Sequence, residues 1–107
     1  MYNLIVLAAR PSTWTHERFI AWWRGEHAEL TRALPGLRRW QHTEVLEAMG
    51  EKSEGWDGLS VLSFDSRADL DAALASPEWA AAVAQVGDMR GRRIAVMGEE
   101  KTMVAER

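Results

Sequence analysis

With 107 residues, the chain is long enough for one hydrophobic core and too short for two, so we expect a single domain over residues 1–107. A net charge of −3 provides no basic surface for nucleic acid or an anionic membrane, and we expect neither as a partner. The absence of cysteine excludes disulfides, thiolate metal sites and cysteine nucleophiles, and we expect a cytoplasmic protein.

The first predicted element is a strand, and the second is an amphipathic helix. The segment NLIVLAAR (3–10) is almost continuously apolar and ends at Pro11, which predicts a buried strand. Thr15 can cap the helix that follows, and Pro35-Gly36 ends it. Side chains recurring at steps of three and four predict one buried helical face, made of His16, Ile20, Trp23, His27, Leu30 and Leu34.

Two further strands and a second helical region follow, and then a last strand. Residues 37–47 and 56–64 have the pattern of strands, and the polar segment 49–55 predicts the loop between them. Ser66 begins a short helix that runs to residue 75, and Ser76-Pro77 begins another that Gly87 ends. Residues 92–98 form the last predicted strand.

The order β-α-β-β-α-β is that of an α+β, ferredoxin-like fold with a four-stranded antiparallel sheet. Both helical regions would cover the same face of the sheet. The first strand is apolar on both of its faces, and the last is nearly so, so the second face of the sheet also needs a cover. We therefore expect a homodimer.

Four segments together resemble the EthD-like family, which is named for the degradation of ethyl tert-butyl ether. They are WWRGEHAEL (22–30), LPGLRRW (34–40), WDGLSVLSFDS (56–66) and ALASPEWAAA (73–82). The resemblance extends over residues 2–100. It implies a dimeric α+β barrel, in which two ferredoxin-like sheets pack against each other. Related barrels include isomerases, polyketide cyclases, cofactor-free monooxygenases and haem proteins, so the fold does not define the reaction.

His27 is the main catalytic candidate. Its helical face is expected to point between the helix and the sheet, and the family's Glu-His-Ala element falls on it. A neutral imidazole there could accept a proton near physiological pH, and burial would keep it neutral. The alternative is a core histidine bonded to the backbone. His16, at the start of the helix, is expected to be exposed.

Five other residues are candidates for substrate binding. Trp23 and Trp40 could hold a planar molecule, although core packing is the alternative for both. His42 is in phase with Trp40 on its strand and could join His27 in one cavity. Tyr2 could place a phenol at the rim of the pocket. Asp57 matches an Asp-Gly of the family, and its carboxylate could orient a histidine or close a turn.

The function predicted from the sequence is isomerase, cyclase or dehydratase chemistry on an aromatic, lactone or polyketide-like substrate. His27 would act as the general base, and we expect no cofactor. No metal-ligand spacing appears, although a histidine could also bind haem, as in related barrels. Two alternatives are a ligand-binding or accessory protein of an oxidative degradation pathway, and a cofactor-free monooxygenase, which would be an oxidoreductase.

Overall fold

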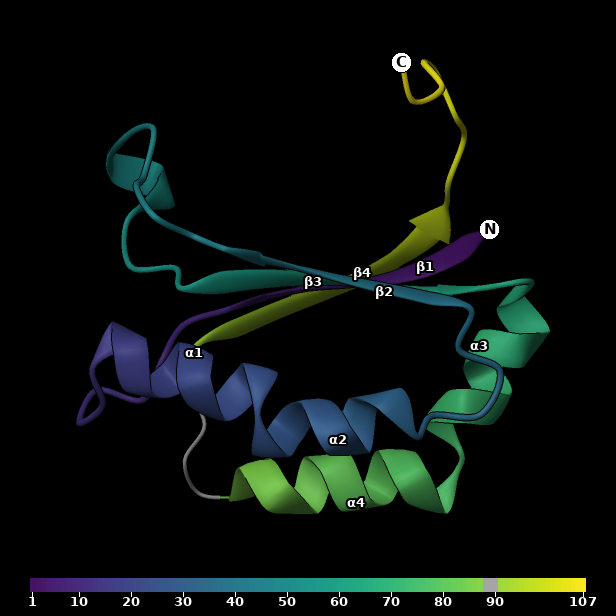
Figure 1. Cartoon of the computed structure of the whole chain (residues 1–107), viewed down its shortest axis with the longest axis horizontal. Helices are drawn as coiled ribbons and strands as arrows, with labels where there is room; N and C mark the ends of the chain where they lie inside the picture. Colours follow the sequence, from purple (N-terminus) through teal and green to yellow (C-terminus); the bar gives the residue numbers. More distant parts are fainter. Residues whose placement is uncertain (88–90) are drawn as a thin grey trace.

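The computed structural model describes residues 1–87 and 91–107 and has two layers, a four-stranded antiparallel sheet and a helical layer (Figure 1). The elements in chain order are β1 (Tyr2–Ala8), α1 (His16–Arg24), α2 (Glu26–Arg32), β2 (Arg39–Glu44), the 3-10 helix η1 (Glu51–Ser53), β3 (Gly58–Phe64), α3 (Arg67–Leu74), α4 (Pro77–Val86) and β4 (Arg93–Glu99). The order of strands in the sheet is β2-β3-β1-β4. The predicted α+β, ferredoxin-like fold is confirmed.

The predicted starts of the helices are also confirmed, because each has the hydroxyl cap that its sequence indicates. The side chain of Thr15 accepts a hydrogen bond from the backbone N–H of Arg18. Ser66 and Ser76 cap α3 and α4 in the same way.

None of the helices in the described residues is long and apolar enough to cross a membrane.

One side of the sheet holds the core. Leu4 of β1 pairs with Leu62 of β3, and both lie in a buried cluster with Leu34 and Leu70 from the helical layer. Because side chains alternate along a strand, the even-numbered residues of β1 and β3 face the helices.

The prediction of one continuous helix from Thr15 to Leu34 is wrong, because the helix breaks at Gly25. The backbone of Gly25 has φ −99° and ψ −105°, which lies outside the helical region. The chain also comes very close there, since a Cβ on Gly25 would lie 2.7 Å from the carbonyl oxygen of Ala21. The break changes which side chains of α1 and α2 share a face.

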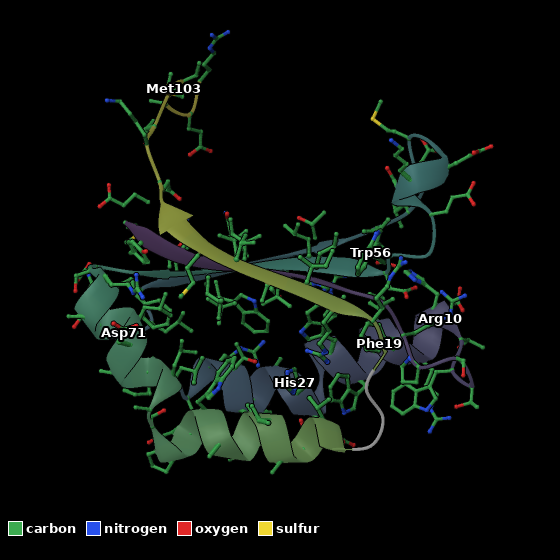
Figure 2. The ribbon with its side chains drawn as sticks, turned by 180° about the vertical axis from the view of Figure 1, so that it is seen from behind. Arg10, Phe19, His27, Trp56, Asp71 and Met103 are labelled. Carbon is green, nitrogen blue, oxygen red and sulfur yellow. The ribbon has the colours of Figure 1, made fainter. Side chains whose placement is uncertain are left out.

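The other side of the sheet is uncovered and apolar at its centre. Ile5 of β1 pairs with Val61 of β3 and with Val96 of β4, so the three side chains share this face. Val96 is 54% exposed and Ile94 is 52% exposed. Both the β2–β3 connection and the C-terminal residues extend on this side of the sheet (Figure 1), and Met103 lies well above it (Figure 2).

Candidate functional site

A cavity of about 250 Å³ lies between the helical layer and the β1–β4 side of the sheet. Most of its wall is apolar and comes from Val6, Leu34, Trp79, Ala82, Val83, Val86 and Ala95. Its polar lining comes from His27, Thr31 and Arg93. Apolar walls with a few polar groups are typical of sites for small molecules.

His27 reaches this cavity from α2, where it is buried with 9% exposure, and Figure 2 shows it in the helical layer. Its Nδ1 lies 3.0 Å from Oε1 of Gln85 on α4. Because an amide oxygen only accepts hydrogen bonds, Nδ1 carries the proton and donates it. Among the described residues, none forms a hydrogen bond with Nε2. No described residue therefore occupies the lone pair of Nε2, and the His27 ring belongs to the wall of the cavity.

Burial lowers the pKa of His27 below its ordinary value of 6.5. The hydrogen bond with Gln85 opposes this shift, and the positive charge of Arg93 adds to it. The ring of Trp22 also stacks on the imidazole, with ring centroids 4.5 Å apart. The net result is a neutral imidazole at neutral pH, in the tautomer that leaves Nε2 basic.

Trp23 and His42 lie together outside this cavity. Their rings meet edge to face, with centroids 4.4 Å apart. Nδ1 of His42 accepts a hydrogen bond from Nε of Arg24, and its Nε2 is buried without a partner among the described residues. Burial lowers the pKa of His42 to about 4, and the charge of Arg24 acts in the same direction. His42 faces the helical layer, but it does not line the His27 cavity, so the expectation that the two histidines share one cavity is wrong.

Trp40 and Tyr2 also lie outside the cavity, packed against the core. Nε1 of Trp40 donates a hydrogen bond to Oγ of Ser60 at 3.1 Å. The hydroxyl of Tyr2 accepts a hydrogen bond from Arg67 at 3.3 Å, at the far end of β1. The structure thus leaves His27 as the only one of the six candidate residues in the wall of this cavity.

Asp57 belongs to a second cluster, at the end of the sheet where Figure 2 shows Arg10 and Trp56. Its Oδ1 accepts hydrogen bonds from Nη1 of Arg10 at 2.6 Å and from Nδ1 of His16 at 2.7 Å. Oδ2 accepts from the backbone N–H of Arg10. Nε2 of His16 bonds Oε2 of Glu44 at 2.8 Å. The cluster lines a surface pocket of about 510 Å³.

The expectation that His16 is exposed is wrong, because this cluster half-buries it between two carboxylates. The hydrogen bonds with Asp57 and Glu44 raise the pKa of His16 above 6.5. Burial raises the pKa of the Asp57 carboxyl, but the hydrogen bonds from His16 and Arg10 outweigh it and the net shift is downward. Since both ring nitrogens are engaged, His16 links α1 to the ends of β2 and β3 and has no free nitrogen for a substrate.

In the described residues, no group of three His, Asp or Glu side chains is placed to hold a metal ion.

Four further residues complete the environment of His27, and the sequence did not place them beside it: Trp22, Gln85, Trp79 and Arg93. The position of Trp79 could have been predicted, because the spacing of Trp79, Ala82 and Val86 places the three side chains on one face of α4. The contact of Gln85 with His27 could not have been predicted from a local pattern, because the two residues are 58 apart in the sequence.

The fold is the ferredoxin-like α+β fold of several solved structures that are described as dimeric. The chain belongs to the EthD family, because the profile of the EthD domain matches residues 11–89. The resemblance found in the sequence is thereby confirmed. No protein of curated function matches the sequence.

Three solved structures illustrate the relationship. An ethyl tert-butyl ether degradation (EthD) family protein from Bacillus halodurans is 27% identical, with a TM-score of 0.80 over 94% of this chain and 99% of that one. A dimeric ferredoxin-like protein of unknown function from Thermobifida fusca is 23% identical, with a TM-score of 0.66 over 91% and 88%. A hydroxynitrile lyase from Passiflora edulis is 16% identical, with a TM-score of 0.76 over 96% of both chains.

Proposed function

We propose that this protein is a small-molecule enzyme in which His27 is the general base. One observation carries the proposal: Nδ1 of His27 donates to Gln85, so that the unprotonated Nε2 remains for a ligand in an apolar cavity. A general base of this kind requires a neutral ring at the working pH, and the lowered pKa of His27 provides it.

The chemistry that one base in an apolar cavity performs is proton transfer next to a carbonyl group. Nε2 takes a proton from the carbon, and the electron pair of the broken C–H bond moves into the carbonyl to form an enolate. Returning the proton to another carbon is an isomerisation. Expelling a group from the neighbouring carbon is an elimination, and the imidazolium then protonates the leaving group. Neither sequence needs a cofactor.

The lyase from Passiflora edulis shows that this fold can support the cleavage of a small molecule, although 16% identity relates the two chains in fold alone. The residues of this chain therefore carry the assignment of the base. The cavity volume of about 250 Å³ lies just below the roughly 300–1,000 Å³ of drug-sized sites. It favours a compact substrate with one ring or a lactone.

The same proposal includes a homodimer, formed through the uncovered face of the sheet. Ile94 and Val96 are more than half exposed on this face, next to the apolar side chains of β1 and β3. Monomeric proteins rarely leave a contiguous apolar surface of this kind open to water. Similar solved structures are described as dimeric, which supports a second copy of the chain as the cover.

The ring opening of 5-nitrobenzisoxazole tests the base without knowledge of the natural substrate. In this reaction a base removes a proton from carbon as the N–O bond breaks, and the product is a coloured phenolate. We expect catalysis that rises with pH through a pKa below 6.5 and then stays constant. His27→Gln should lower the rate by about 100-fold or more. His42→Asn is the control, because His42 lies outside the cavity, and it should keep the rate.

A folded His27→Gln variant that retains the rate would remove His27 as the base. Circular dichroism and the elution volume of the variant establish that it is folded and has the same assembly state as the parent.

A further inference from the structure

Arg93 gives the His27 cavity a positively charged end. It is the first residue of β4 and pairs with Ala8 of β1, whereas Ala95 pairs with Val6. Alternation along the strand turns Arg93 and Ala95 to the same side as Val6, and all three line the cavity. A guanidinium and an imidazole thus line the same cavity, from the sheet and from the helical layer.

Thr31 supplies the third polar group of the cavity. The hydroxyl of Thr31 donates a hydrogen bond to the backbone carbonyl of His27 at 3.2 Å. A ligand that enters therefore meets an apolar wall, the basic nitrogen of His27 and the guanidinium of Arg93. A guanidinium has five N–H donors in a planar fork, so it can bind a carboxylate while it keeps other contacts within the chain.

We propose that the His27 cavity binds a small apolar carboxylic acid, with its carboxylate on Arg93 and its apolar part against Trp79. The inference rests on the proposed function only in placing the reacting carbon of this acid at Nε2 of His27. The binding of the acid is a separate property of the cavity, because it requires Arg93 and the apolar wall but not a basic histidine.

The electrostatics of His27 supply a direct readout of this binding. The charge of Arg93 contributes to the lowered pKa of His27. A bound carboxylate neutralises that charge and brings a negative charge near the ring, so it must raise the pKa of His27. By reciprocity, the acid must bind more tightly as His27 becomes protonated.

Phenylacetate and its neutral analogue phenylacetamide are the probes for the experiment. Binding is followed by tryptophan fluorescence and by NMR of the His27 ring during a pH titration. We expect phenylacetate to bind about tenfold or more tightly than phenylacetamide, as for hydrogen bonds between charged groups. Phenylacetate should also raise the pKa of His27, and high salt should weaken its binding.

Arg93→Met should abolish the preference for the acid, and Arg93→Lys should keep part of it because Lys retains the charge without the planar fork. Arg92→Met removes the same charge one residue away. Because the guanidinium of Arg92 lies over Trp56 instead of in the cavity, this control should keep the preference.

Equal affinity for the two probes, or a preference that survives in Arg93→Met, overturns the inference. His27→Gln separates it from the proposed function. If this variant loses ring-opening activity while phenylacetate binds independently of Arg93, only the inference fails. If it keeps the activity while the acid still requires Arg93, the assignment of the base fails and the binding site stands.

Discussion

Trp22, and not its neighbour Trp23, stacks on the ring of His27, with centroids 4.5 Å apart and ring planes inclined by 18°. In a continuous helix Trp23 would share a face with His27, four residues on. The break at Gly25 instead directs Trp23 to His42. Two adjacent tryptophans thus contact two different histidines.

Replacing each tryptophan with phenylalanine should separate these roles. In Trp22→Phe the smaller ring covers less of His27, so the pKa of His27 should rise towards 6.5. In Trp23→Phe the pKa of His27 should stay constant, and that of His42 should rise from about 4. NMR titration of the histidine rings measures both values in each variant. A shift of the His27 pKa in Trp23→Phe, with none in Trp22→Phe, would contradict the stacking arrangement.

Gln85 should control both the tautomer and the pKa of His27. Gln85→Leu leaves the buried Nδ1–H without an acceptor, which we expect to cost about 1–3 kcal/mol of stability. It should also lower the pKa of His27 further, because the bond with Gln85 raises it. Gln85→Glu places a carboxylate at Nδ1 and should raise the pKa. The nitrogen chemical shifts of the ring report the tautomer, and an NMR titration measures the pKa. If the pKa of His27 changed in the same direction in the two variants, Gln85 would not have this role.

The elements of the fold were accessible from the sequence because their signals are local. The caps at Thr15, Ser66 and Ser76 lie within three residues of the backbone groups that they bind. The apolar pattern of β1 on both faces likewise pointed to a second cover for the sheet.

The surroundings of His27 were not accessible, because they depend on one backbone rotation and on contacts distant in the sequence. A glycine inside a helical pattern does not reveal that its ψ will be −105°, and this rotation exchanges Trp22 for Trp23 beside His27. In the same way, His16 meets Asp57 and Glu44 only once the strands have aligned their ends, 41 and 28 residues away. Periodicity shows the face a residue occupies and leaves its partner undetermined.

The His16 cluster should stabilise the fold most in mildly acidic solution. His16 has a folded pKa above 6.5, so its charged contribution is complete below pH 6.5 and is lost as the pH rises through the folded value. Asp57 has a folded pKa below 3.8, so its contribution is complete above pH 3.8 and is lost as the pH falls through the folded value. His16→Gln should therefore cost about 1.5–3 kcal/mol near pH 5 and less at pH 9. Urea unfolding across this range measures the difference, and a cost that grows with pH would refute the charge assignment.

His42 should make the protein sensitive to acid. Its folded pKa of about 4 lies below the ordinary 6.5, so the unfolded chain takes up this proton first as the pH falls. Stability should decrease between pH 6.5 and about 4 for this reason. His42→Asn removes the titration and retains an acceptor for Nε of Arg24. Its unfolding free energy should change less over this interval than that of the parent, and an unchanged slope would show that His42 does not contribute.

A charge on the uncovered face of the sheet should separate the proposed dimer. Val96 is 54% exposed at the centre of this face, beside Ile5. In a dimer formed through the sheets, Val96→Glu would bury a carboxylate in an apolar interface, which costs far more than such an interface can tolerate without a partner charge. We expect a monomer by light scattering. Ala81→Glu adds the same charge to an exposed position of α4 and should leave the dimer intact. A Val96→Glu variant that remains a dimer would place the interface elsewhere, because two copies of this face could not then pack without burying both carboxylates.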